Sequence, residues 1–118
     1  MTPPNLAAPI IGLPASGRRL RVRFTVQCDS SCIGSARITV SRRVAARLGL
    51  GRTRTVGKAG LRVSGAGKAT FVVTLSRQAR RAMTRQGVRR IAVTLRAEAT
   101  DAESQRTVRR RSARISRP

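Results

Sequence analysis

The feature that most constrains the fold is the strict alternation of apolar and polar residues over 20–26, LRVRFTV. Successive side chains of a β-strand point to opposite faces, so Leu20, Val22, Phe24 and Val26 share one face. The same period of two recurs further along the chain, at 36–40, 69–75, 88–99 and 107–115, with a weaker stretch over 53–64. This pattern predicts a mainly β protein with six strands.

Two short helices are expected in the connections between strands. Ser41 and Ser76 each follow a strand and precede a basic segment, and a serine hydroxyl there can accept a bond from a free backbone N–H. The predicted helices cover 42–48 and 77–85, and Gly49 and Gly87 end them. Turn signals roughly every ten residues favour an antiparallel β-sandwich. The alternative is one open sheet built from β-β-α repeats.

The chain of 118 residues fits one domain preceded by a linker. Residues 1–17 hold four of the five prolines and are predicted to be an extended linker, and 18–116 the domain. No stretch approaches the ~20 apolar residues of a membrane span. The N-terminus lacks a basic segment and a long apolar run, so it is not an intact signal peptide. If the natural protein is exported, we expect this chain to be a mature fragment or an excised domain.

Cys28 and Cys32 stand in the segment QCDSSC, between the first two predicted strands. Three intervening residues do not match the redox CxxC motif, and a zinc site needs four ligands in a chain that has no histidine and no other cysteine. The favoured interpretation is a disulfide across a hairpin loop, which would stabilise by roughly 2 kcal/mol and imply an oxidising compartment. The alternative is two buried reduced thiols.

Residues for catalysis are scarce. The chain has no histidine, the commonest general base, and four carboxylates, Asp29, Glu98, Asp101 and Glu103. The last three cluster at one segment that we predict to be a solvated hairpin turn. We therefore expect no enzyme activity, no metal site and no cofactor.

The charge is the strongest functional signal. Twenty-six Lys and Arg face four Asp and Glu, for a formal net charge of +22, which attracts polyanions. Adjacent strands bring some of these cations together at a cost in stability, and a bound polyanion would relieve that cost. The second helix is also coated with arginine. The candidate polyanion-binding residues are Arg19, Arg21 and Arg23 on the outer face of the first strand, and Arg89, Arg90, Arg96, Arg109, Arg110 and Arg111 in the last two.

The partners expected from this charge are anionic glycans, wall polymers or lipid headgroups. Nucleic acid is also a candidate, through sequence-independent phosphate contacts. Base stacking is not available, because Phe24 and Phe71 both fall in inward register and the chain has no Tyr or Trp. The alternative is a solvated basic surface with no dedicated ligand.

A family resemblance rests on the order of six segments. A basic strand and QCDSSC are followed by a strand with SRRVAARLGLG, then by GKATFVVTLSRQARRAM, IAVTLRAEATDAESQRT and a terminal Arg-rich strand. Over about 18–116 this order resembles the immunoglobulin-like β-sandwich modules repeated in exported and cell-surface proteins of high-GC bacteria. The final hairpin departs from their pattern at Glu103, Ser104 and Gln105, where small or Gly-Asn residues are usual.

The resemblance implies an immunoglobulin-like fold and a role as a spacer, stalk or adhesive unit. We expect a non-catalytic extracellular or cell-envelope module that attaches electrostatically to anionic polymers. The alternative is a cytoplasmic, sequence-independent nucleic-acid-binding protein that uses its arginine surface. The cysteines help to separate the two, because a formed disulfide favours export and free thiols favour the cytoplasm.

Overall fold

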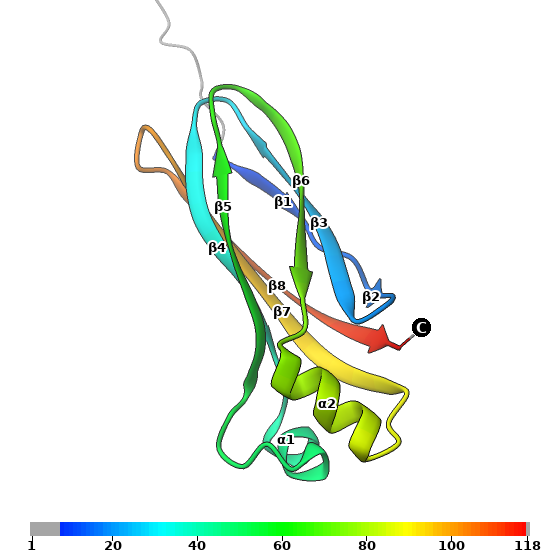
Figure 1. Cartoon of the computed structure of the whole chain (residues 1–118). Helices are drawn as coiled ribbons and strands as arrows, with labels where there is room; N and C mark the ends of the chain where they lie inside the picture. The colour runs from blue at the N-terminus through cyan, green and yellow to red at the C-terminus, as the bar shows by residue number, and fades with distance from the viewer. Residues whose placement is uncertain (1–7, 118) are drawn as a thin grey trace, which may run out of the picture.

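Two β-sheets pack face to face in the computed structural model, which describes residues 8–117 (Figure 1). One sheet has three strands in the order β1-β3-β6, and the other has five in the order β2-β8-β7-β4-β5. The strands are β1 (Ile10–Gly12), β2 (Ser16–Gly17), β3 (Arg21–Cys28), β4 (Cys32–Thr39), β5 (Thr55–Val63), β6 (Gly67–Thr74), β7 (Arg90–Asp101) and β8 (Arg106–Ser116).

The strand order confirms the predicted immunoglobulin-like sandwich. In the larger sheet, β8-β7-β4-β5 corresponds to the G, F, C and C′ strands of a variable-type domain, and β1-β3-β6 corresponds to A, B and E. Every pairing is antiparallel except that of β2 with β8, which is parallel. The N-terminal segment therefore passes from one sheet to the other, which the purely antiparallel prediction did not include.

The domain begins earlier than residue 18, so the predicted linker is too long. Strand β1 pairs with β3, β2 pairs with β8, and the N–H of Arg114 donates to the carbonyl of Ala15 at 3.1 Å. Proline cannot donate to a β-ladder, but Pro9 and Pro14 stand outside the two short strands and leave their pairing intact. The remainder of the predicted linker, 1–7, lies outside the described residues.

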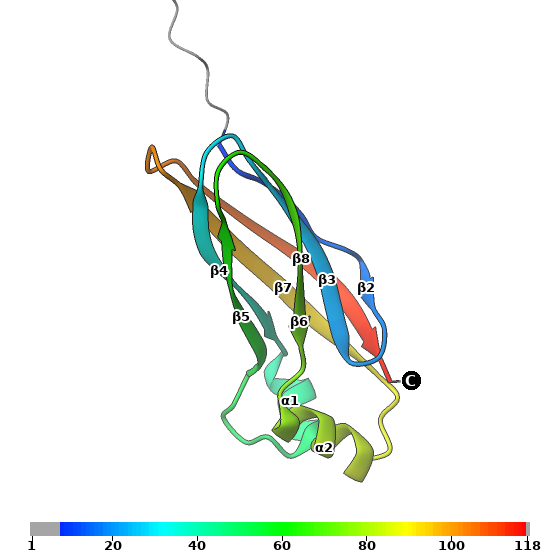
Figure 2. The ribbon, with the colours of Figure 1, turned by 45° about the horizontal axis from the view of Figure 1, so that its top comes forward.

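Both helices have the predicted bounds, α1 over Arg42–Leu48 and α2 over Arg77–Arg85. Ser41 and Ser76 are their N-caps, and each hydroxyl accepts a hydrogen bond at 3.2 Å from the backbone N–H three residues on. Gly49 ends α1 in the left-handed conformation, with φ 72°. The two helices lie together at one end of the sandwich, where they close it (Figure 2).

The core is aliphatic, as the alternation predicts. Val22, Phe24 and Val26 of β3 are buried and face the inner residues of the larger sheet, such as Ile38. Phe71 is only half-buried; its ring stacks on that of Phe24 with centroids 5.7 Å apart. Strand β6 lies at the edge of its sheet, so one side of Phe71 has no neighbouring strand to cover it.

The turn before β3 differs from the prediction, which placed Arg19 and Leu20 on the strand. Both have left-handed backbones, with φ 56° and 61°, and the N–H of Arg21 donates to the carbonyl of Arg18 at 3.2 Å. Such tight turns normally use Asn and Gly. Here hydrogen bonds from Leu20 to the carbonyl of Ser116 (3.1 Å) and from the N–H of Leu75 to Leu20 (2.9 Å) hold the turn, so tertiary contacts override local preference.

The stretch over 53–64 also differs, because β5 continues through Gly57 and Gly60 without interruption. Gly57 is close to β6: a Cβ atom at this position would lie 3.0 Å from the carbonyl oxygen of Thr74. A glycine in a strand can therefore mark a close backbone approach between the sheets as well as a break.

Candidate polyanion-binding surfaces

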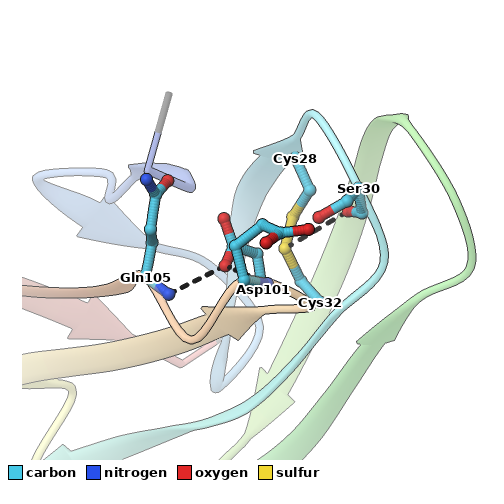
Figure 3. The surroundings of a disulfide bond; sticks show 6 residues. Cys28, Ser30, Cys32, Asp101 and Gln105 are labelled. Carbon is cyan, nitrogen blue, oxygen red and sulfur yellow. Dashed lines mark hydrogen bonds between the residues drawn. A yellow bond between two sulfur atoms is a disulfide. The ribbon is translucent and has the colours of Figure 1, made fainter. Parts of the chain in front are cut away.

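The predicted disulfide between Cys28 and Cys32 is present, with the two Cα atoms 6.4 Å apart. The prediction placed it across a hairpin, but β3 and β4 belong to different sheets and do not pair. The bond therefore joins the end of β3 in the smaller sheet to the start of β4 in the larger sheet (Figure 3). Both cysteines are buried, so the link lies at the edge of the core.

Asp101 lies beside this disulfide and organises the turn between β7 and β8 (Figure 3). Its Oδ1 accepts hydrogen bonds from the backbone N–H groups of Glu103 (2.9 Å) and Gln105 (2.8 Å), and Ser104 between them has a left-handed φ of 62°. The predicted turn is present, but Asp101 is only 7% exposed and is not solvated. Within residues 8–117, no three His, Cys, Asp or Glu side chains gather to form a metal site.

The negative side chains are confined to the part of the molecule away from the helices, whereas positive side chains occur throughout. The turns that carry Asp29, Asp101 and Glu103 lie at the end opposite the helices, and Glu98 is on β7 near them (Figure 1). We define the helical end as residues 18–20, 40–54, 75–90 and 116–117. It contains no Asp or Glu and fourteen arginines, which are Arg18, Arg19, Arg42, Arg43, Arg47, Arg52, Arg54, Arg77, Arg80, Arg81, Arg85, Arg89, Arg90 and Arg117. The helical end therefore carries +14 of the formal net charge of +22, which is a charge distribution that favours polyanions.

An open hollow of about 530 Å³ lies between α2 and the turn at Leu20. Leu20 supplies an apolar wall, and the polar groups are those of Arg77, Arg80, Arg81, Thr84 and Arg85. The buried side of α2, formed by Ala79, Ala82 and Met83, fixes the helix to the core, so its arginines are held toward solvent. Several guanidinium groups can therefore reach one anionic group in this hollow.

The charges of α2 oppose the stability of the helix. Arg77, Arg81 and Arg85 are four residues apart, and like charges at that spacing destabilise a helix by about 0.2–0.5 kcal/mol per pair. Its first turn has no acidic residue, although the N-terminus of a helix favours negative charge. A bound anion would reverse both effects.

Two other hollows collect predicted site residues, one beside the helical end and one within it. Arg19, Arg21 and Arg23 border the first, of about 410 Å³, together with Arg18. They do not form the predicted stripe, because the turn moves Arg19 off the strand. Arg89 and Arg90 line the second, of about 660 Å³, with Ser116 and Arg117.

The three consecutive arginines of β8 divide between its two faces. Arg110 lies opposite Arg96 of β7 on the outer face of the larger sheet. Arg109 and Arg111 lie in inward register but are exposed near the sheet edge, and a guanidinium N–H of Arg111 donates to the carbonyl of Leu13 at 3.0 Å. The three predicted residues therefore do not form one cluster, because neighbouring residues of a strand face opposite ways.

The structure adds two residues that the sequence did not single out. Arg37 of β4 pairs with Arg96 on one side and with Lys58 of β5 on the other. Lys58, Arg37, Arg96 and Arg110 thus stand directly opposite one another on four adjacent strands, and we call them the cation row. Only the strand register brings them together.

Glu98 is the acidic side chain on the outer face beside this row. It accepts a hydrogen bond from the guanidinium of Arg106 and lies 3.5 Å from Arg96. The hydrogen bond from Arg106 lowers the pKa of Glu98 below its ordinary value, and the charges of Arg106, Arg96 and Arg37 act in the same direction against the opposing effect of desolvation. Glu98 thus serves as a built-in counterion for part of this face.

No family model and no curated protein sequence matches the chain. Among solved structures, it is similar to the periplasmic chaperone SfaE, with a TM-score of 0.58 and 13% identity over 92% of this chain and 56% of the chaperone. It is also similar to a superoxide reductase (neelaredoxin) from Ignicoccus hospitalis, with a TM-score of 0.50 and 10% identity over 94% of this chain and 82% of that protein.

The chain therefore spans little more than half the length of the chaperone. None of the helices formed within residues 8–117 has the length and apolar character needed to cross a membrane. At these identities the similarities concern the fold alone, and the fold is an immunoglobulin-like β-sandwich.

Proposed function

We propose that this domain is a non-catalytic structural or adhesion module of the cell exterior or cell envelope, and that its helical end attaches it to anionic polymers. The observation that carries this proposal is the segregation of charge, with fourteen arginines and no Asp or Glu at the helical end. The hollow beside α2 and the hollow lined by Arg89, Arg90 and Arg117 both lie at this end, so an anion can meet several guanidinium groups at once.

The location outside the cytoplasm is inferred from the disulfide. Structural disulfides form and persist in oxidising compartments and are rare in the cytosol. Thiol titration of the protein purified from its native source tests this inference. A value of no free thiol supports it, and two free thiols per chain would contradict it.

The non-catalytic role is inferred from the chemistry that the side chains offer. The chain has no histidine, Glu98 is bound by Arg106, and Asp101 is bound by two backbone N–H groups. Two carboxylates with structural partners are poor general bases, because proton transfer would break the contacts that hold them.

Binding across a salt series tests the attachment. We would measure the affinity of the domain for a labelled sulfated polysaccharide and for duplex DNA, from about 50 mM to about 200 mM salt. The helical-end variant is Arg77→Gln/Arg81→Gln/Arg85→Gln. The control variant removes the same charge outside the helical end and outside the candidate binding residues, as Arg62→Gln/Lys68→Gln/Arg114→Gln.

We expect polysaccharide binding that persists at about 150 mM salt and is weakened much more by the helical-end variant than by the control variant. Equal weakening by both variants would show that net charge alone drives binding, and would overturn the proposal. Tighter binding to duplex DNA than to the polysaccharide at the same salt would favour the nucleic-acid function instead.

A further inference from the structure

We propose that one linear anionic polysaccharide chain lies along the cation row, across the strands on the outer face of the larger sheet. The inference rests on the proposed function and adds to it a second site and a class of polymer. The helical end and the row are distinct sets of residues, so each can be tested without changing the other.

The geometry of the row comes from strand pairing. Lys58, Arg37, Arg96 and Arg110 are direct cross-strand partners on β5, β4, β7 and β8. Adjacent strands are about 4.8 Å apart, so the four cations span about 14 Å at right angles to the strands. Lys58, Arg37 and Arg110 are exposed and Arg96 is half-buried, so all four heads reach solvent.

The row is only one residue wide. On one side of the row, the neighbouring residues of the same face carry hydroxyl groups. They are Thr39, Thr94 and Ser112, which are again direct cross-strand partners. On the other side the neighbouring residues of this face are Ser35 of β4, Glu98 of β7 and the exposed Val108 of β8. A single file of cations bordered on one side by hydroxyl groups complements a single chain that carries both anionic groups and hydroxyls.

Sugar polymers with sulfate, phosphate or carboxylate groups have this chemistry. Single-stranded nucleic acid has regularly spaced charges too, but proteins that bind it stack its bases on aromatic side chains. The outer face of the larger sheet has none, since Phe24 and Phe71 are both on the smaller sheet and the chain has no Tyr or Trp. The face therefore favours a polysaccharide over a nucleic acid.

The row is also unfavourable when empty. Like charges directly opposite each other on neighbouring strands destabilise a sheet, and this row contains three such pairs. Glu98 compensates the positive charges of Arg96 and Arg106. It does not reach the two ends of the row, because Lys58 lies two strands away from it and Arg110 lies one strand away. An anionic chain that spans the row would compensate all four cations.

The first test is loss of affinity. We would titrate the domain with a sulfated hexasaccharide and with a single-stranded oligothymidine of similar charge. The row variant is Lys58→Gln/Arg37→Gln/Arg110→Gln, and the control variant is the one described above. We expect the row variant to lose at least about tenfold in affinity for the hexasaccharide, because three counterion-releasing contacts are removed, and the control variant to lose much less.

The second test is gain of affinity, which a misfolded variant cannot mimic. Glu98→Gln removes the negative charge beside the row, and Glu103→Gln makes the same change of net charge in the distant turn. We expect Glu98→Gln to bind the hexasaccharide at least about twofold more tightly, since its like charge no longer repels the ligand, and Glu103→Gln to leave the affinity near the wild-type value.

Equal affinities of the row and control variants would overturn the inference, and so would equal gains from the two glutamate substitutions. Neither result would affect the proposed function, which the helical-end variant tests. Tighter binding of the oligothymidine than of the hexasaccharide, lost in the row variant, would keep the site but overturn the assignment of its ligand to a polysaccharide.

Discussion

A single surface substitution, Arg77→Glu, should make the domain more stable and weaken its binding to polyanions. Arg77 is the first residue of α2, directly after the capping Ser76, and its side chain is exposed. It is a like-charge neighbour of Arg80 and Arg81, three and four residues on. The substitution turns two repulsive pairs into attractive ones and places a negative charge at the positive end of the helix.

The magnitude follows from these changes. Each pair contributes about 0.2–0.5 kcal/mol, and reversing its sign doubles the effect. Reversing the charge at the helix terminus adds about 0.6 kcal/mol or more. Together we expect about 1.5–2.5 kcal/mol of stabilisation, which raises the melting temperature of a chain of this length by about 6–10 °C.

Thermal unfolding followed by circular dichroism at low ionic strength measures this shift. Arg85→Glu is the matched control, because it makes the same change of charge at the C-terminal end of the helix, where a cation is favourable. There the gain from the pair with Arg81 and the loss at the helix terminus nearly cancel, so the melting temperature should change little. A melting temperature for Arg77→Glu at or below that of the wild type would refute the assignment of repulsion to α2.

Three further predictions concern stability. Ser41→Ala and Ser76→Ala should each lower the free energy of unfolding by about 1 kcal/mol in urea denaturation, because each removes the hydrogen bond that caps a helix; no change would contradict the capping role. Reducing the disulfide should lower it by about 2 kcal/mol, and the Cys28→Ala/Cys32→Ala variant should not respond to the reductant. The contacts of Glu98 stabilise the fold where its carboxylate is charged, and this contribution should fade as the pH falls through the lowered pKa of the group. Glu98→Gln should therefore be less stable than the wild type at neutral pH, and the difference in the free energy of unfolding should disappear in acid. A difference that does not depend on pH would show that the charge of Glu98 does not stabilise the fold.

The elements that the sequence predicted well are those with a local physical signal. Alternation over 20–26 and 69–75 identified the inner faces of β3 and β6, and the serine caps with their following basic segments identified both helices. The immunoglobulin-like fold that the resemblance implies agrees with the observed strand order.

The elements that were missed depend on partners distant in the sequence. Strands β1 and β2 are three and two residues long, and their alternation is too short to be recognised without β3 and β8 beside them. The turn at Arg19 and Leu20 has no glycine and is held by hydrogen bonds to residues 75 and 116. The Cys28–Cys32 pairing was predicted, but its role between the sheets follows from the topology alone.

The candidate sites show the same division. Composition indicated a polyanion partner, but it could not show which of the basic residues lie together. The cation row joins residues 37, 58, 96 and 110, and the pairing of four strands must be known before that row exists. The division of 109–111 between two faces could have been read from alternation, since Thr107, Ala113 and Ile115 mark the inner face of β8.

A solvated basic surface without a dedicated ligand is the principal alternative. It predicts a different distribution of charge from the two proposed binding sites. If charge serves only solubility, like charges should be spread to limit repulsion. In this domain they are concentrated along α2 and across four strands, at positions where helix and sheet geometry make repulsion costly. Natural sequences mostly accept such local conflicts at functional sites. Variants equal in charge but different in position therefore decide between the two explanations, because a solubility surface responds to the number of arginines removed, and a binding surface responds to which ones they are.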